Sequence, residues 1–199
     1  MTKLIIFDIG GVIEDFAEED YINYICRKLS LDRKAFGSEL LRMLPSVEDG
    51  KATNRELLDR LTSRFGVSAK KLEWAGALKK LAKLNPKMVA LFNALSLRYE
   101  VVLLTNVSRS RYMQNIDIGL FRKLKFPRVY ASCYLRMSKP GTEIYKYVLK
   151  KEHVKAEDAV FIDNMAENTE GAEKVGITGV QFVGYDKLVR DLRKIGIKW

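Results

Sequence analysis

Four short apolar runs, each bounded by polar or glycine residues, constrain the fold of this chain more than any other feature. The runs are residues 3–7, 101–104, 159–162 and 179–183. Short unbroken apolar runs of this kind are typical of strands buried on both faces of a parallel sheet. Helix-like stretches lie between and around them, at residues 86–97, 109–116, 142–151 and 167–175. Strands that alternate with helices predict an α/β fold, a doubly wound parallel sheet of the Rossmann-like kind.

The stretch from residue 16 to residue 84 does not follow this alternation of strands and helices. It shows no convincing strand, and its apolar residues recur at helical spacing. Thr53 and Glu56 have the spacing of a capping box, which marks a helix start. We therefore expect about four helices here. The predicted division is an α/β core domain at 1–15 and 85–199 with an all-helical cap domain inserted at 16–84.

Composition limits the chemistry. Cys26 and Cys133 form no metal-binding pair, and His153 is the single histidine of the 199 residues. Mechanisms built on a histidine triad or a histidine-rich metal site are poorly supported. Any catalytic chemistry in this chain is therefore expected to use carboxylates, lysine, threonine and a hard cation.

The lengths of the apolar runs and the net charge indicate where the protein is located and which partners it has. No apolar run approaches the roughly 20 residues that span a bilayer, and the first run is too short for a signal peptide. We expect a cytoplasmic protein with no membrane contact. The net charge of +10 is interpreted mainly as a solvated surface, because basic and acidic residues alternate. No zinc-finger spacing, RNP motif or arginine-rich block is visible, so nucleic acid is not an expected partner.

Polar residues gather where three of the predicted strands end. The residues are Asp8, Thr105 with Asn106, and Asp163 with Asn164. In an open α/β sheet, ligands bind beyond the carboxyl ends of the strands. A lone Asp in this position is usually a turn former, but three strand ends together predict one crevice with two carboxylates and a hydroxyl. Lys139 could supply a cation beside them.

Four segments, taken in order, resemble the motifs of the haloacid dehalogenase superfamily, and the resemblance covers nearly the full chain. They are residues 7–13, 103–106, 137–140 followed by Ile144-Tyr145, and 161–164 leading to Asn168, Gly171 and Ala172. The helical insertion after the first segment is similar to the first-type (C1) cap of this superfamily.

The resemblance implies roles in phosphoryl transfer. Asp8 would be the nucleophile and would form an aspartyl-phosphate. The Thr105 hydroxyl, the Asn106 backbone amide and the Lys139 ammonium would bind the transferring oxygens, where negative charge needs stabilisation. Lys139 is thus both a catalytic and a phosphate-binding candidate.

A magnesium site is implied by the same resemblance. Its ligands would be Asp8, the backbone carbonyl of Gly10, Asp163 and, as the weakest candidate, Asn164; Mg²⁺ suits such an oxygen-only set. Asn168 is expected to support the loop after Asp163. Gly11 is expected to allow a tight turn after Asp8, and Gly171 is expected to allow a helix to approach its neighbour closely.

Two positions depart from the pattern. Gly10 stands where related phosphatases commonly carry a second acid, a group that contributes about 10² to 10⁴-fold. Some sugar-phosphate phosphatases of the superfamily also have Gly there, and Asp15 could compensate or could serve a helix N-terminus. Asn164 stands where a second acid is often found, which would weaken magnesium binding.

The leading hypothesis is a magnesium-dependent phosphatase that hydrolyses a small phosphorylated metabolite, as a monomer or homodimer. The alternatives are a weakly active or inactive phosphometabolite-binding or regulatory protein and, less favoured because of Asp163, a haloacid dehalogenase. The segment 46–51, expected as a loop between two cap helices, is interpreted either as a substrate contact or as an ordinary surface turn.

Overall fold

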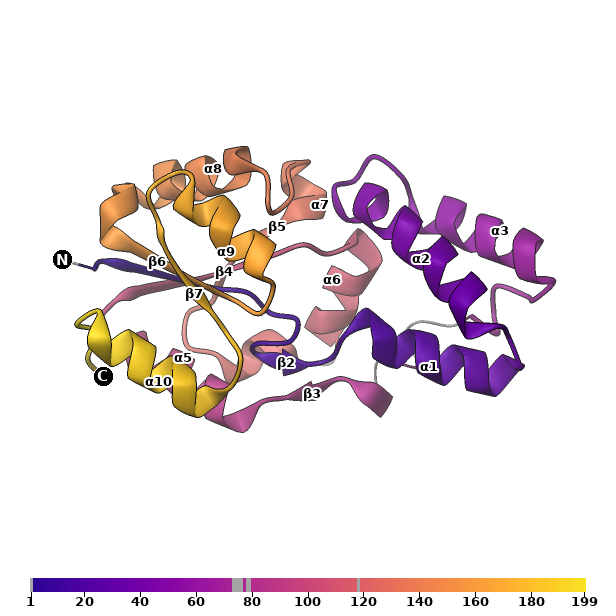
Figure 1. The fold of residues 1–199 in the computed structure, drawn as a ribbon, viewed down its shortest axis with the longest axis horizontal. Coiled ribbons are helices and arrows are strands. Elements are labelled where there is room, and N and C mark those ends of the chain that lie inside the picture. The colour runs from indigo at the N-terminus through magenta and orange to yellow at the C-terminus, as the bar shows by residue number, and fades with distance from the viewer. Residues whose placement is uncertain (1, 73–76, 78–79, 118) are drawn as a thin grey trace.

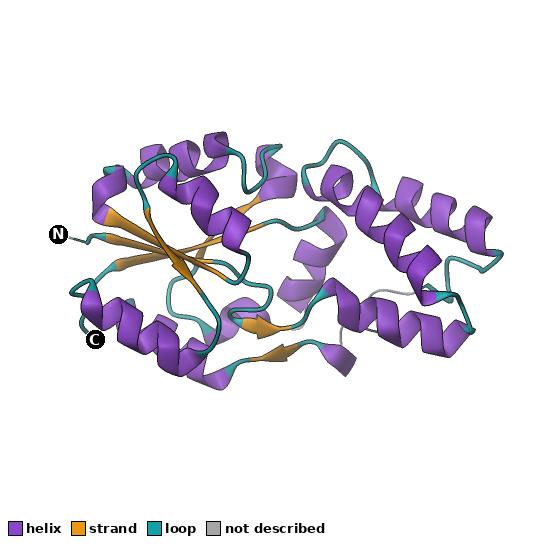
Figure 2. Cartoon of the chain, in the orientation of Figure 1, coloured by secondary structure: helices purple, strands orange, loops and turns teal. Residues whose placement is uncertain are grey.

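A five-stranded parallel sheet forms the centre of the molecule (Figures 1 and 2). The computed structural model describes residues 2–72, 77, 80–117 and 119–199. The strands lie in the order β5-β4-β1-β6-β7, and their bounds are β1 Leu4–Phe7, β4 Glu100–Thr105, β5 Arg128–Ala131, β6 Ala159–Asp163 and β7 Thr178–Gln181. The chain moves outward from β1 to one edge and then returns to build the other. This confirms the predicted doubly wound α/β fold.

Helices cover both faces of the sheet, which explains the unbroken apolar runs of the strands. Residues Ile5 and Phe7 of β1 join a core cluster with α5 and α10, whereas Leu4 and Ile6 join a second cluster on the opposite face, with α8 and α9. The two helix pairs lie on opposite sides of the sheet in Figure 1. Their bounds are α5 Pro86–Leu95, α8 Thr142–Glu152, α9 Ala166–Glu173 and α10 Tyr185–Lys194.

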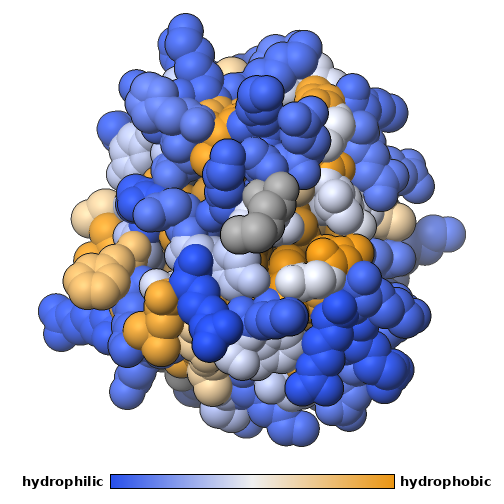
Figure 3. All heavy atoms as spheres, turned by 90° about the vertical axis from the view of Figure 1, so that its left-hand side faces the viewer, coloured by the Kyte–Doolittle hydropathy of each residue, from blue (hydrophilic) through white to orange (hydrophobic). Residues whose placement is uncertain are grey.

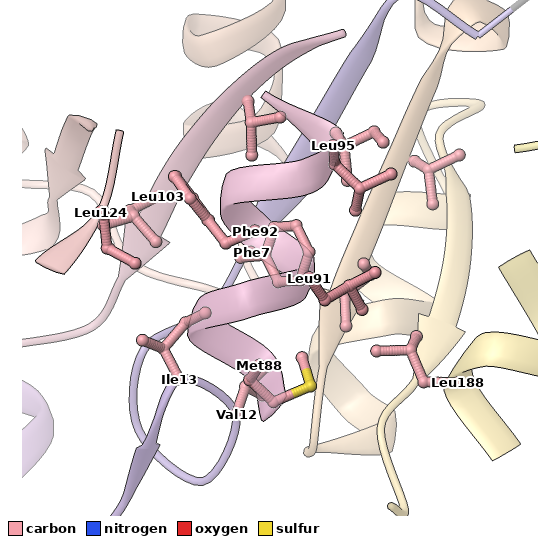
Figure 4. Packing of buried hydrophobic residues seen from close by; sticks show 14 of the residues in the cluster. Phe7, Val12, Ile13, Met88, Leu91, Phe92, Leu95, Leu103, Leu124 and Leu188 are labelled. Atoms are coloured by element: carbon pink, nitrogen blue, oxygen red, sulfur yellow. The ribbon is translucent and has the colours of Figure 1, made fainter. Parts of the chain in front are cut away.

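The larger core cluster centres on helix α5. Phe92 points from α5 toward Phe7 of β1, with Met88 and Leu95 on the same side of the helix (Figure 4). The two aromatic rings are tilted with centroids 5.6 Å apart, a favourable arrangement for aromatic pairs. Burial of both faces of β1 therefore fixes the strand whose end carries Asp8.

The insertion is helical and has an apolar cluster of its own. Its described helices are α1 Glu18–Leu29, α2 Arg33–Glu48 and α3 Asn54–Phe65. The capping box is confirmed, since Thr53 Oγ1 accepts from the Glu56 amide and Glu56 Oε2 accepts from the Thr53 amide. A fourth expected helix would include residues 73–76 and 78–79, which lie outside the described residues.

The two connections between the sheet and the insertion run side by side as a small antiparallel sheet. Strand β2 (Glu14–Asp15) pairs with β3 (Lys83–Leu84). The expectation of no strand between 16 and 84 was wrong at this point. A two-residue strand carries no periodic signal, and only the pairing partner defines it.

Several other elements escaped the sequence patterns. Strand β5 is only partly buried and contains Arg128, so it has no continuous apolar run. The segment 46–48 is not a loop, because α2 continues through Pro45 to Glu48. Helix α10 follows the last predicted strand. The remaining elements are α6 Arg109–Asp117, α7 Ser132–Leu135 and the short 3₁₀ helices η1 Leu120–Lys123 and η2 Ala156–Asp158.

The end of the molecule opposite the inserted helices is mainly hydrophilic, with scattered apolar side chains (Figure 3). This agrees with the interpretation of the net charge as a solvated surface. None of the helices in the described residues has the length and apolar character required to cross a membrane.

The Phe7–Phe92 contact gives a stability prediction. Phe92 is fully buried, so Phe92→Ala would remove its contacts and leave a cavity. We expect the free energy of unfolding to fall by about 3–5 kcal/mol, measured by urea denaturation. The control is Leu97→Ala, because Leu97 is 70% exposed. Equal effects of the two substitutions would contradict this account of the core.

Candidate active site

The carboxyl ends of three adjacent strands bring the predicted site residues together. Asp8 follows β1, and its amide donates to the carbonyl of Ile162 in β6 at 2.9 Å. Thr105 and Asp163 are the last residues of β4 and β6, the two neighbours of β1. A cavity of about 360 Å³ opens at this edge, and its wall includes Asp8, Gly10, Thr105, Asn106, Lys139 and Asn164.

Lys139 lies between the two carboxylates. Its Nζ is 2.8 Å from Asp8 Oδ1 and 2.6 Å from Asp163 Oδ2. The ammonium also lies 5.3 Å from the ring centroid of Phe161. All the charged groups are buried, where pairing matters far more than at a surface. Asp163 is fully buried, and its contacts Lys139, Met165 and Asn168 all lie in the cavity wall.

With both carboxylates ionised, this cluster carries one more negative charge than positive charge. Burial raises the pKa of Asp8 to about 6, assisted by the Asp163 charge and opposed by Lys139. Burial alone would lower the pKa of Lys139, but the two carboxylates outweigh burial and raise it. The lysine therefore stays an ammonium, and two carboxylates share a single cation.

The side chain of Asn106 holds Lys139 in place. Its Nδ2 donates to the Lys139 carbonyl at 2.8 Å, and its Oδ1 accepts from the Lys139 amide at 2.9 Å. This two-bond clamp joins the loop after β4 to the loop that carries the lysine. Sequence reasoning gave Asn106 only a backbone role, because its partner lies 33 residues away.

Asp163 is held by its own loop. Its Oδ1 accepts from the Met165 amide at 2.8 Å, and Asn168 Nδ2 lies 3.1 Å from both carboxylate oxygens. A Cβ on Gly171 would lie 2.5 Å from the Pro140 carbonyl oxygen. Helix α9 can therefore approach the Lys139–Pro140 segment only with glycine at this position.

The turn after Asp8 is also tight. Gly11 has a φ of +71°, and a Cβ there would lie 2.6 Å from Asn164 Nδ2. The Asn164 side chain thus packs directly on the turn that presents the Gly10 carbonyl. The turn and the loop after β6 fit together only around a glycine.

The candidate metal ligands are all oxygens: the carboxylates of Asp8 and Asp163, which contact Lys139, and the Gly10 carbonyl and Asn164 amide of the same cavity wall. Within the described residues there is no cluster of three or more His, Cys, Asp and Glu side chains that could hold a metal. A softer metal that prefers nitrogen and sulfur would lack ligands here. Oxygen donors with net negative charge fit Mg²⁺, which binds through one or two carboxylates and keeps several waters.

Asp15 does not reach the site. It is exposed on β2, and Asn85 Nδ2 donates to it at 3.5 Å, so the idea that it compensates for Gly10 is wrong. Its neighbour Glu14 is buried instead and forms an ion pair of 2.5 Å with Arg111 of α6. The Arg111 guanidinium lies 4.7 Å from the ring centroid of Phe16.

Glu14 and Arg111 form a polar wall of the cavity that the sequence did not indicate. Burial raises the pKa of Glu14 and lowers that of Arg111, each opposed by the partner. Among the described residues, Glu14 Oε1, Arg111 Nη1 and Asn115 Oδ1 are buried without a hydrogen-bond partner. Because the pair is 97 residues apart, no local pattern could have revealed it.

The segment 46–51 contributes one residue to the cavity. Glu48, the last residue of α2, lies in the same wall as Asp8 and Gly10. Its pKa is raised to about 8, first by burial and then by neighbouring negative charge. Asp49 caps the helix and pairs with Lys51 away from the cavity wall.

Sequence comparison establishes the family. The family model for haloacid dehalogenase-like hydrolases matches residues 2–176, which is most of the chain. The chain belongs to this family of hydrolases, and the resemblance inferred from its four motifs is confirmed.

Two curated relatives come from fungi. A drimenol cyclase of Aspergillus calidoustus is 25% identical over 203 aligned residues, which cover 98% of this chain and 37% of the relative. A sesquiterpene phosphatase of Aspergillus oryzae is 30% identical over 91 residues, which cover 42% of this chain and 46% of the relative. The chain thus spans less than half the length of either protein.

Solved structures share the fold. The HAD family enzyme bt-2542 of Bacteroides thetaiotaomicron, in complex with magnesium and inorganic phosphate, has a TM-score of 0.76 and 21% identity, covering 94% of this chain and 97% of that chain. The L-2-haloacid dehalogenase of Xanthobacter autotrophicus has a TM-score of 0.65 and 16% identity, covering 100% and 85%. At these identities the likeness shows the fold alone.

The raised pKa of Asp8 gives a stability prediction for the metal-free protein. Asp8 titrates near 6 when folded against 3.8 ordinarily, so its contribution to stability is lost as pH rises through this window. Asp8→Asn cannot ionise. We expect it to raise the melting temperature relative to wild type, and by more at pH 7.5 than at pH 4.5.

The control for this prediction is Asp186→Asn, which replaces an exposed carboxylate on α10. Calorimetry of the metal-free proteins at both pH values gives the comparison. An Asp8→Asn effect that is equal at the two pH values would contradict the assigned cause.

Proposed function

We propose that this hydrolase is a magnesium-dependent phosphatase whose nucleophile is Asp8. The observation that carries the proposal is the buried cluster in which Lys139 contacts both Asp8 and Asp163 beside the ends of β1, β4 and β6. Such a cluster offers a carboxylate nucleophile, a fixed cation and an oxygen-donor metal site in one cavity. These are the groups that phosphoryl transfer requires.

In the proposed reaction, one Asp8 oxygen attacks phosphorus in line as the bond to the leaving oxygen breaks. The Asp8 acyl-phosphate then reacts with water, which splits one difficult displacement into two easier ones. The Lys139 ammonium, the Thr105 hydroxyl and the Asn106 backbone amide bind the phosphoryl oxygens. Their positions are fixed before reaction by the Asn106 clamp and by burial, so little reorganisation is needed.

Asp8, the Gly10 carbonyl, Asp163 and Asn164 are the proposed magnesium ligands. When bound, Mg²⁺ would supply positive charge to the phosphoryl oxygens and help to orient them. Helices α1 to α3 are the proposed cap, whose α2 forms one wall of the cavity and excludes water.

Asp163 supports a phosphatase over a haloacid dehalogenase. A second carboxylate beside Asp8 adds negative charge that a single lysine does not neutralise. Dehalogenation of a haloacid needs no metal ion, so this extra charge would have no use there. In a phosphatase the same charge attracts the divalent cation.

The test is hydrolysis of p-nitrophenyl phosphate with and without Mg²⁺, in wild type, Asp8→Asn and the control Asp186→Asn. We expect magnesium-dependent turnover in wild type and in the control. Asp8→Asn should lose at least about 10³-fold in kcat, because the nucleophile is absent.

Full activity of Asp8→Asn would refute the nucleophile. Tight binding of phosphate esters without turnover in wild type would instead favour a binding or regulatory protein.

For the organic part of the substrate, we propose an apolar group. The cavity wall also contains Leu41, Leu44 and Pro45 of α2, together with Met165. Leu41 is 44% exposed and Met165 is 48% exposed, so apolar surface of the cavity wall is open to contact with a ligand.

A second, mainly apolar cavity adjoins the first. It measures about 370 Å³, and Leu44 and Ser108 lie in the walls of both cavities. Its wall includes the leucines Leu57, Leu58 and Leu72. The name of the sesquiterpene phosphatase among the relatives also supports a phosphate ester with an apolar organic group.

A series of linear alkyl phosphates tests this substrate class. We expect kcat/KM to rise with chain length, by at most about fourfold per methylene, since burying one CH₂ is worth about 0.8 kcal/mol. Leu41→Asp should flatten the rise, whereas the control Leu97→Asp, at a 70% exposed position, should leave it unchanged. A flat series in wild type, or better turnover of sugar phosphates, would contradict an apolar substrate.

A further inference from the structure

Hydrolysis of an alkyl phosphate requires a proton on the departing oxygen, and the residue two positions after Asp8 is a glycine. The cavity wall contains seven titratable side chains, namely Asp8, Glu14, Glu18, Glu48, Arg111, Lys139 and Glu167. Asp8 is the proposed nucleophile, Lys139 is paired with two carboxylates, and Glu14 is paired with Arg111. Three glutamates remain as proton carriers.

Exposure and attachment to the sheet domain separate these three. Glu167 is exposed on α9, whereas Glu18, in the first turn of α1, is half-buried. Glu48 is half-buried, and within the described residues its carboxyl group makes no hydrogen bond or ion pair. Glu18 is also half-buried, but the backbone of Glu48 is held by a buried hydrogen bond from Ser132, so Glu48 is the glutamate with a fixed place in the cavity wall.

The backbone of Glu48 is fixed to the sheet domain. Ser132 Oγ, from α7, donates to the Glu48 carbonyl at 2.5 Å and accepts from the Val107 amide at 2.9 Å. Ser132 is fully buried, so this link is shielded from water. It ties the end of α2 to the loop after β4, which carries the phosphate-binding candidates.

Close packing supports the same link. A Cβ on Gly50, just after α2, would lie 3.0 Å from the Cys133 carbonyl oxygen. Gly50 also has a φ of +71°, a left-handed conformation that favours glycine. The chain around Glu48 therefore approaches α7 closely and has little freedom to move away from the site.

Charged groups from several elements face Glu48. After burial, the negative charges of Glu18, Asp8 and Asp49 raise its pKa, and Lys139 opposes them, for a value of about 8 against 4.5 ordinarily. A carboxyl group in this environment holds its proton at neutral pH and can donate it.

We propose that Glu48 is the acid and base of the reaction, supplied by the cap in place of the acid missing at Gly10; this rests on the phosphatase function proposed above. As Asp8 bonds to phosphorus and the phosphorus–oxygen bond to the alcohol breaks, the Glu48 proton passes to the alcohol oxygen. Water then attacks the acyl-phosphate and gives its proton to Glu48. Free Asp8 carboxylate and inorganic phosphate result, and Glu48 is protonated again.

The structure also shows where an acid could be restored. A Cβ on Gly10 would meet only the Phe16 carbonyl oxygen, at 3.8 Å, which is ordinary contact, and Gly10 lacks the left-handed φ of Gly11. An aspartate at position 10 is therefore sterically allowed. This permits a rescue experiment in which the acid returns from a different element.

The experiment compares two esters in the presence of Mg²⁺. Octyl phosphate has an alkoxide leaving group that needs a proton, whereas p-nitrophenyl phosphate has a stable phenolate leaving group. For Glu48→Gln, kcat on octyl phosphate should fall by about 10² to 10⁴-fold, and kcat on p-nitrophenyl phosphate by far less. The alkaline limb of kcat/KM for octyl phosphate should disappear.

Gly10→Asp in the Glu48→Gln background should restore octyl phosphate turnover by about tenfold or more. The control is Glu170→Gln, an exposed carboxylate of α9 outside the cavity wall, which should leave both activities unchanged.

The possible failures are distinguishable. If wild type turns over both esters and Glu48→Gln matches it, or loses both esters equally without rescue by Gly10→Asp, the role of Glu48 is refuted and the phosphatase stands. If wild type turns over neither ester, the phosphatase function is refuted, and the role of Glu48 with it.

Discussion

The contact of one buried ammonium with two buried carboxylates is the constraint on which the rest of this site depends. Lys139 lies within 2.8 Å of Asp8 and 2.6 Å of Asp163, and each of these groups would be costly to bury alone. One positive charge between two negative ones leaves the site short of positive charge. Burial raises the pKa of Asp8, with the Asp163 charge adding to the rise, and the unbalanced negative charge makes the site suitable for a divalent cation.

Much of the surrounding structure serves to hold this cluster. Asn106 clamps the backbone of Lys139, Asn168 donates to Asp163, and Gly171 lets α9 reach the lysine segment. These contacts join the loops after β4 and β6 with the segment between β5 and α8. A change in any of these contacts would move a charged group. In a region of low dielectric constant, such a movement would change its interaction energy with the neighbouring charges more than it would in water.

The inserted helices complete the cavity rather than merely cover it. Ser132 links the end of α2 to the loop after β4, so Glu48 is carried by the insertion but positioned by the sheet domain. The apolar side chains of α2 extend from the same helix. In the proposed mechanism, α2 would present a proton carrier and an apolar surface to the two ends of the leaving group.

By itself the sequence determined the alternation of strands and helices, because unbroken apolar runs are short-range signals. Local motifs likewise identified the family and the strand ends at Asp8, Thr105 and Asp163. Only the tertiary structure decided which distant groups meet. The Glu14–Arg111 pair, the Asn106 clamp and the place of Glu48 all join segments far apart in the chain, and strand β5 has too little burial to leave a pattern. Such contacts depend on how the packed elements are oriented, which local periodicity does not encode.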